Sequence, residues 1–275
     1  MVYIKTPGEI KVMAEGGKIL AGIMKELEKQ VRPGITTKEL DRLAEGLIFS
    51  YGGQCSFKGY KGQNNELGKP FPACLCTSIN EEIVHAIPSE RILKEGDIVS
   101  LDLGFFYKGF HTDMAVTLAV GKVNPAAPKL IEVTKRALEI GIEKVKPGNF
   151  LGDISRAIQK YVEGQDFNVV RELCGHGIGR DIHEEPEILN SVSMPTGRQA
   201  FDKETVDKVK YFGDAKIQLK EGMVLCLEPM VTMDDWHIKK SADGFGWETK
   251  DSSLSCHFEH TVVVVENGCW ILTSF

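Results

Sequence analysis

The sequence contains no long hydrophobic run, no secretory signal and no excess of positive charge. Its purely apolar runs are short, on the scale of residues 262–265, whereas a bilayer-spanning helix needs about 20 apolar residues. Residues 1–9 lack the apolar region of about seven or more residues that a signal peptide requires. Lys and Arg total 33 against 39 Asp and Glu, and the net charge of −6 argues against a protein built to bind nucleic acid. We therefore expect a cytoplasmic protein with neither a membrane nor DNA as a partner.

Cysteine motifs are also missing. The chain has seven cysteines, an odd number, and no Cys-x2-Cys pair, because Cys74 and Cys76 are separated by a single residue. This pattern argues against a disulfide framework and against a thiolate zinc site. We expect reduced, mostly buried cysteines.

The periodicity predicts a mixed helix and strand protein of 275 residues, with 42% hydrophobic and 26% charged residues, typical of one large or two small folded domains. Helix caps and apolar spacing predict helices from Pro7 to before Pro33, from Thr36 to Gly52, from Asn124 to about Val145, and from about Leu151 to Val162. Runs rich in Val, Ile, Leu and Phe predict strands over residues 73–79, 97–105, 110–120, 167–172, 223–233 and 255–265. Two helices followed by strands occur twice, which indicates an α+β or α/β domain of two similar halves.

Three internal repeats support this duplication. Residues 31–34 recur at 145–148, residues 93–96 at 219–222, and residues 111–113 at 257–259. The three matches fall in the same order, with offsets of 114, 126 and 146 residues. The sequence therefore predicts a pseudo-two-fold domain with half-repeats of roughly residues 1–122 and 123–275.

The repeat places acidic residues at equivalent positions, Asp102 with Glu228 and Asp113 with Glu259. Asp and Glu are depleted in strands, yet each of these begins or ends an apolar strand segment. A turn at residues 107–109 would bring the first two together across a hairpin, and the two-fold would bring in the others. Any one of them could be an ordinary edge or capping acid. Four converging carboxylates repel one another, and two divalent cations would neutralise them. The oxygen-rich donors suit Mn, Fe or Co at least as well as Zn.

A glycine-rich segment, residues 173–186, offers the histidine that would complete such a site. Its glycines would let the backbone approach a ligand closely, and it contains His176 and His183. The spacing excludes a phosphate-binding loop and the His-Glu-x-x-His zinc motif. Two histidines in this context favour a functional over a structural role.

Several segments together resemble the type I methionine aminopeptidases, which have the pita-bread (creatinase-like) fold. The segments are residues 78–88, the Asp102/Asp113 hairpin, and residues 175–179, 183–186, 227–230 and 253–261. The resemblance covers nearly the whole chain in the family's order. It implies one catalytic domain over residues 1–275, an α+β pita-bread fold with a pseudo-two-fold and antiparallel sheets covered by helices.

The resemblance also implies a site. The ligands of two divalent ions (Co, Mn, Fe, Ni or Zn) would be Asp102, Asp113, His176, Glu228 and Glu259, with Asp113 and Glu259 bridging. The catalytic residues would be His85, His183 and Glu228, of which Glu228 transfers the proton. The substrate-binding residues would be His85 and His183, and a methionine pocket of Phe57, Tyr60, Cys76, Ile182 and Trp247. A monovalent cation would bind near Asn80 and Ser255.

The activity implied is removal of the initiator methionine from nascent proteins when the second residue is small, through a hydroxide that bridges the metal ions. We expect a monomer that contacts the ribosome transiently. Three features depart from the family: Ala86 replaces its usual glycine, and residues 61–70 and 190–217 look like insertions near the site. Two alternatives remain, a prolidase-type Xaa-Pro aminopeptidase of the same fold and a non-catalytic pita-bread binding module. Only 101 residues precede Asp102, too few for the extra domain that the Xaa-Pro enzymes usually carry.

Overall fold

The computed structural model describes residues 2–61, 68–192 and 214–274. Four helices lie where the sequence predicts them: α1 (Pro7–Glu28), α2 (Thr37–Ser50), α3 (Ala126–Glu143) and α4 (Leu151–Glu163). The first begins at Thr6, whose side chain accepts a hydrogen bond from the Glu9 amide while the Glu9 carboxylate accepts one from the Thr6 amide. Thr36 and Glu39 form the same capping box at the start of α2. These reciprocal caps satisfy backbone donors that a helix start leaves free.

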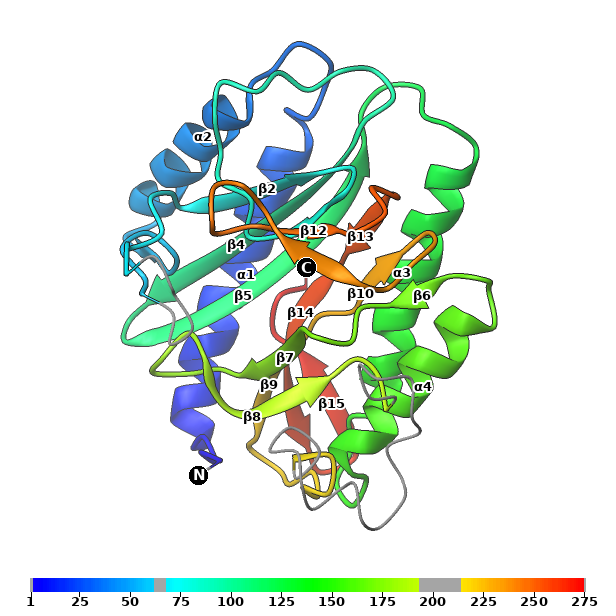
Figure 1. The fold of residues 1–275 in the computed structure, drawn as a ribbon. Coiled ribbons are helices and arrows are strands. Elements are labelled where there is room, and N and C mark those ends of the chain that lie inside the picture. Colours follow the sequence, from blue (N-terminus) through cyan, green and yellow to red (C-terminus); the bar gives the residue numbers. More distant parts are fainter. Residues whose placement is uncertain (1, 62–67, 193–213, 275) are drawn as a thin grey trace.

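One antiparallel sheet of nine strands forms the centre of the molecule (Figure 1). Its order is β1-β4-β5-β14-β9-β7-β8, with β2 also paired to β4 and β15 to β14. The strands are β1 (Gln54–Cys55), β2 (Leu75–Ile79), β4 (Ile98–Tyr107), β5 (Phe110–Ala119), β7 (Cys174–Gly177), β8 (Glu184–Leu189), β9 (Val224–Leu227), β14 (Glu259–Val265) and β15 (Gly268–Ile271). The β5–β14 pairing joins the two halves of the chain.

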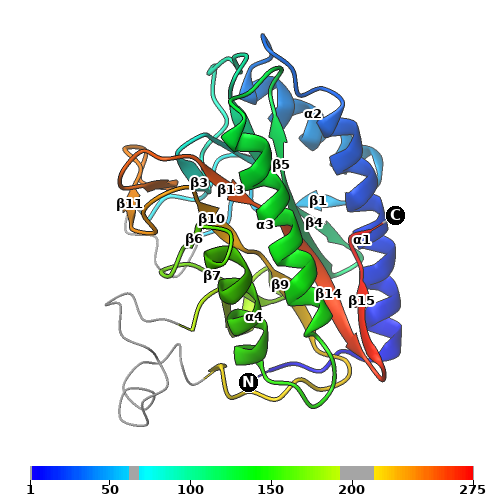
Figure 2. The same ribbon diagram turned by 90° about the vertical axis from the view of Figure 1, so that its right-hand side faces the viewer.

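Two three-stranded sheets complete the strands. One contains β13 (Ser255–His257), β10 (Met230–Thr232) and β6 (Asn168–Val169), and the other β11 (Ile238–Lys240), β12 (Trp247–Thr249) and β3 (Glu82–Val84). Strands β10, β11 and β13 lie on the opposite side of the main sheet from α1 (Figure 2).

The hydrophobic core follows the two halves. One cluster packs α1 and α2 against β2, β4 and β5, with Leu20, Leu40 and Leu101 fully buried. The other packs α3 and α4 against β9, β13 and β14, with Leu130, Ile158 and Val262 fully buried. Each helix pair thus covers its own half of the sheet, as in Figure 1, where α1 and α2 are blue and α3 and α4 green. This arrangement confirms the predicted pseudo-two-fold α+β architecture.

Within the described residues, no helix has both the length and the apolar character needed to cross a membrane.

Two predicted strands are broken, each beside a candidate carboxylate. The strand expected over 223–233 splits into β9 and β10 at Glu228 and Pro229, and the one over 255–265 splits into β13 and β14 at Phe258. At each break the chain leaves one sheet for another. Proline has no amide proton for a ladder, which accounts for the first break.

The prediction that all cysteines are reduced is wrong. Cys55 and Cys74 form a disulfide, with their Cα atoms 5.1 Å apart. Both β1 and β2 pair with β4, Cys55 opposite Phe105 and Leu75 opposite Leu103, so the end of β1 meets the start of β2. The spacing of the cysteines in the sequence does not predict this end-to-end placement of β1 and β2.

The two expected insertions, residues 61–70 and 190–217, lie mostly outside the described residues, which omit 62–67 and 193–213.

Candidate metal centre

The β4–β5 hairpin brings the first two candidate carboxylates together. Asp102 pairs with Ala115 and Gly104 with Asp113, so the two aspartates are diagonal neighbours on one face. The turn that closes this hairpin contains Lys108 and Gly109, both with positive φ (49° and 90°), which is typical of a tight two-residue turn. Asp102 and Asp113 are only 6% and 3% exposed.

The second pair of carboxylates lies at the two strand breaks. Leu227 pairs with His260 and Met230 with His257, and these pairings bracket Glu228 and Glu259 on opposite sides of the same ladder. Glu259 also pairs with Ala115, which stands two residues after Asp113 on β5. All four carboxylates are buried, and oxygens of Asp102, Asp113 and Glu259 lie within 4.8 Å of one another.

The electrostatics of this cluster fit a cation. Among the described residues, Asp102 Oδ1, Asp113 Oδ1 and Glu259 Oε1 are buried without a hydrogen-bond partner. Burial raises the pKa of Asp102 from 3.8 to about 7. Burial and neighbouring carboxylates raise the pKa values of Asp113, Glu228 and Glu259 well above their usual range. Divalent ions ligated by oxygen would supply the charge that allows these groups to ionise together.

His176 adds a nitrogen donor from β7. Its Nδ1 donates to the Gly177 carbonyl oxygen at 2.9 Å, which leaves a lone pair on Nε2, 3.5 Å from Glu228 Oε1. Desolvation lowers the pKa of His176 to about 4, so the ring is neutral and able to ligate a metal. Glycines flank it because a Cβ on Gly175 or Gly177 would lie 2.3 Å from a carbonyl oxygen of a neighbouring strand.

His85 and His183 are exposed to solvent, unlike the carboxylates. The rings of His183 and His176 are 4.4 Å apart, and His183 Nδ1 lies 2.7 Å from the Tyr60 hydroxyl. Desolvation by the surrounding protein, and the neighbouring His183, lower the pKa of His85 to about 4. Desolvation and then His176 lower the pKa of His183 well below its usual value. Both rings are therefore neutral at pH 7.

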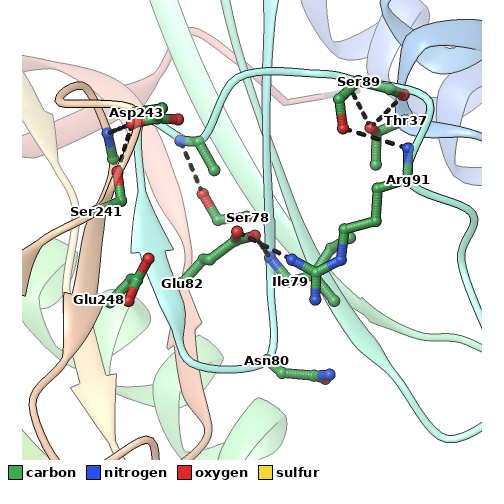
Figure 3. Close-up of polar contacts among 12 residues, drawn as sticks. Thr37, Ser78, Ile79, Asn80, Glu82, Ser89, Arg91, Ser241, Asp243 and Glu248 are labelled. Atoms are coloured by element: carbon green, nitrogen blue, oxygen red, sulfur yellow. Dashed lines mark hydrogen bonds and ion pairs between the residues drawn. The ribbon is translucent and has the colours of Figure 1, made fainter.

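A network of polar contacts holds the segment that contains His85 (Figure 3). Ser78 Oγ accepts a hydrogen bond from the amide that follows His85. The Glu82 carboxylate accepts from the Ile79 amide at 2.8 Å and from the Arg91 guanidinium at 2.9 Å. His85 itself has φ 62°, a left-handed conformation that is uncommon for a residue other than glycine.

The structure brings four of the five predicted pocket residues into two neighbouring clusters. Phe57 and Tyr60 pack against the cluster that includes Ile182, and Phe57 also packs against the cluster that includes Cys76. Trp247 lies in a third cluster with Val84.

The sequence analysis missed two aromatic neighbours of these residues, Phe71 and Phe245. The rings of Phe57 and Phe71 are 6.5 Å apart and those of Phe71 and Phe245 5.7 Å apart, both edge-to-face. Only their aromatic character marks them in the sequence.

Two further residues near the carboxylates were also missed. Cys226 Sγ lies within 4.8 Å of donor atoms of His176 and Glu259, and burial raises the pKa of its thiol well above the usual value. His257 Nε2 lies 3.7 Å from Glu228 Oε2. The sequence did contain one signal for them. Cys226 stands two residues before Glu228 and His257 two residues before Glu259, and residues two apart on a strand point to the same face.

The expected monovalent cation residues do lie together. The Asn80 carbonyl oxygen accepts hydrogen bonds from the Ser255 amide at 2.8 Å and from the Ser255 hydroxyl at 3.0 Å. The Asn80 side chain donates a hydrogen bond from Nδ2 to the Asp97 carboxylate and accepts one from the Ile98 amide at Oδ1.

A curled antiparallel sheet with buried acids at its centre is the architecture of one class of metal-dependent hydrolases. The model of metallopeptidase family M24 matches residues 11–266, and the chain belongs to this family. Its full-length relatives include methionine aminopeptidase 1 of Bacillus subtilis (strain 168), 42% identical over 273 residues and 99% of each chain. Methionine aminopeptidase of Escherichia coli (strain K12) is 39% identical over 99% of this chain and 94% of that protein.

Solved structures agree with these relatives. The crystal structure of methionine aminopeptidase from Rickettsia prowazekii matches with a TM-score of 0.87 and 36% identity over the whole of both chains. An Xaa-Pro dipeptidase from Bacillus anthracis shares only the fold, with a TM-score of 0.71 and 20% identity. This chain covers 62% of that protein. These matches confirm the predicted pita-bread fold.

Proposed function

We propose that the protein is an aminopeptidase that removes N-terminal methionine when the next residue is small. One observation carries the proposal: four buried carboxylates from both halves of the sheet converge with His176, and three of their oxygens have no hydrogen-bond partner among the described residues. Full-length similarity to proteins named methionine aminopeptidase gives the substrate class.

The metal ligands in this proposal are Asp102, Asp113, His176, Glu228 and Glu259. Two divalent ions suit them, since four carboxylates carry a charge of −4; Mn, Fe, Co, Ni and Zn are the candidates. When bound, such ions make water nucleophilic near neutral pH and polarise a carbonyl oxygen. The remaining steps belong to side chains of the protein.

Glu228 is the proposed proton carrier. Its carboxylate borders the cluster, and burial raises its pKa, which makes it a good proton acceptor. It takes a proton from the attacking water and passes it to the leaving amine. Its backbone is held by Asn190, whose Nδ2 donates to the Glu228 carbonyl oxygen at 2.9 Å.

The two exposed histidines are placed to bind the peptide carbonyl. A neutral imidazole has one N–H donor. The Tyr60 hydroxyl lies 2.7 Å from His183 Nδ1, and when it donates to that nitrogen the His183 proton is on Nε2. His183 then donates to the oxygen that becomes negative in the transition state, and His85 binds the same group or the next carbonyl.

The methionine side chain would bind among the apolar residues next to these histidines. Phe57, Phe71 and Phe245 provide aromatic rings, which contact a thioether favourably, and Cys76 lies in the same cluster. Asn80 and Ser255 would bind a monovalent cation through the Asn80 carbonyl. We further propose that the protein is a cytoplasmic monomer that acts on nascent chains in transient contact with the ribosome.

A peptide assay tests this function. Protein loaded with Mn²⁺ is incubated with Met-Ala-Ser, Met-Leu-Ser and an Ala-Pro peptide together, and products are followed by mass spectrometry. We expect methionine release from Met-Ala-Ser alone, loss of release with EDTA and its return with Mn²⁺.

Two variants sharpen the assay. Asp113→Asn removes one ligand and is expected to abolish release, whereas Asp166→Asn changes an exposed acid in the same chemical way and should leave release intact. Cleavage of the Ala-Pro peptide would favour an Xaa-Pro peptidase. No cleavage with Mn²⁺, or with Fe, Co, Ni or Zn loaded in its place, would favour a binding module.

A further inference from the structure

His257 is a buried histidine that none of the roles above uses. Its side chain is on β13 and is 1% exposed. Both ring nitrogens are buried without a hydrogen-bond partner among the described residues. A buried polar group left unpaired costs about 1–3 kcal/mol, so packing alone does not account for a histidine here.

The ring lies next to one carboxylate. His257 Nε2 is 3.7 Å from Glu228 Oε2, while His176 Nε2 is 3.5 Å from Glu228 Oε1. Each carboxylate oxygen therefore has a different histidine beside it. Met230, the first residue of β10, pairs with His257, and Glu228 lies two residues before it, at the break that precedes β10.

The backbone of His257 is held by hydrogen bonds to the Thr117 side chain. Thr117 Oγ1 accepts a hydrogen bond from the His257 amide at 3.0 Å and donates to the His257 carbonyl oxygen at 2.7 Å. The Ser100 hydroxyl lies 2.8 Å from the same Thr117 oxygen. A movement of about 0.8 Å by the flexible glutamate side chain, rather than by the histidine, would bring the ring nitrogen and Oε2 to hydrogen-bond distance.

The related histidine of the first half does not share this position. The internal repeat equates His257 with His111. His111 Nδ1 lies 2.8 Å from Ser56 Oγ, so that ring has a partner away from the carboxylates. Only the second-half histidine combines an unpaired ring with a nearby candidate ligand.

We propose that His257 is a positioning residue that donates its Nε2 proton to Glu228 Oε2 and so aims Oε1 at the metal centre. Hydrogen bonds from residues behind a ligand commonly orient it in this way. This inference rests on the proposed function, because it assumes that Glu228 ligates a metal and carries the proton.

The test compares His257→Leu, which removes the donor, with His257→Gln, which retains an N–H donor. Mn²⁺ binding to the metal-free protein is measured by calorimetry, and kcat and KM are measured separately with Met-Ala-Ser. We expect the leucine variant to bind Mn²⁺ about 10- to 100-fold more weakly. We also expect it to lower kcat with little change in KM, and the glutamine variant to recover most of both losses. His237→Gln, on the exposed surface, is the matched control and should match the original protein.

Thermal unfolding of the metal-free proteins separates positioning from packing. A positioning role predicts that His257→Leu unfolds at the same or a higher temperature than the original protein, since it removes unpaired buried nitrogens. Equal Mn²⁺ affinity and kcat in the leucine variant, or a glutamine variant as impaired as leucine, would overturn the proposal.

A measurement on the unaltered protein covers the case in which the leucine variant does not fold. In protein with ¹⁵N-labelled histidine, Zn²⁺ should shift the proton signal of the His257 Nε2–H downfield and slow its exchange with water; the signal is assigned by its absence in His257→Gln. An unshifted, rapidly exchanging proton would contradict the hydrogen bond. Calorimetry and NMR use no peptide, so they can fail while the peptide assay succeeds, and the reverse.

Discussion

Metal removal should make the stability of the protein depend on pH. Burial raises the pKa of Asp102 to about 7 from a usual value of 3.8. Between these values the native protein without metal keeps a proton that the unfolded chain releases. Stability therefore falls as pH rises through this range. A difference of about three pH units at about 1.4 kcal/mol each gives a loss of about 4 kcal/mol from Asp102 alone.

The other carboxylates strengthen this trend. The pKa values of Asp113, Glu228 and Glu259 are raised as well, chiefly by burial, so their ionisation also opposes folding of the metal-free protein. Bound divalent ions reverse the effect, because they favour the ionised carboxylates of the native state. The stabilisation produced by metal should thus increase with pH between about 4 and 7.

Urea denaturation at pH 5 and pH 7 measures this dependence, with EDTA-treated and Mn²⁺-loaded protein in parallel. We expect the EDTA-treated protein to lose about 2 kcal/mol of unfolding free energy between these pH values from Asp102 alone, and the loaded protein to lose much less. Asp102→Asn should flatten the profile of the EDTA-treated protein. A free energy of unfolding that is equal at pH 5 and pH 7 without metal would refute the reasoning.

Two further predictions concern stability. Lys5 and Glu184 form an ion pair at 2.6 Å with side chains only 5% and 4% exposed, so Lys5→Met should cost about 3–5 kcal/mol in urea denaturation by leaving a buried charge unpaired. Lys38→Met, at an exposed pair, is the control and should cost at most about 1 kcal/mol; equal costs would contradict the reasoning. The Cys55–Cys74 disulfide closes a loop with a sequence separation of 19, so Cys55→Ser should lower stability by about 3 kcal/mol. The difference should vanish in dithiothreitol, and seven free thiols in the denatured, unreduced protein would disprove it.

Local signals account for the parts of the fold that the sequence predicts well. Thr6 and Glu9 predict the start of α1 because a capping box involves residues three positions apart. The β4–β5 hairpin follows from two apolar runs around Gly109, and its acids follow from the period of a strand. Family resemblance then supplies roles that spacing alone leaves open.

Long-range register determines what the sequence does not predict. Cys55 meets Cys74 because β1 and β2 pair with neighbouring stretches of β4, a tertiary fact without a local pattern. The strands around His176 contain glycines and charged residues that weaken any strand signal. His257 is recognisable only once the pairing of β13 with β10 brings its ring to 3.7 Å from the Glu228 carboxylate.

The two halves position their candidate ligands differently, although the acids occupy equivalent places in the internal repeat. Asp102 and Asp113 lie within unbroken strands. Asp102 pairs with both β2 and β5, and the Asp113 backbone is held by pairing with β4 on one side and by the Thr261 hydroxyl on the other. Glu228 and Pro229 lie at the strand break where the chain leaves the nine-stranded sheet at the end of β9 and enters a three-stranded sheet at β10. In its proposed role as ligand and proton carrier, Glu228 would change its hydrogen bonds during the reaction, which an acid at a strand break can do with less disturbance of the sheet. In the proposed mechanism, the first half would therefore provide two carboxylates fixed within strands, and the second half would provide the carboxylate that carries the proton, with His257 beside it.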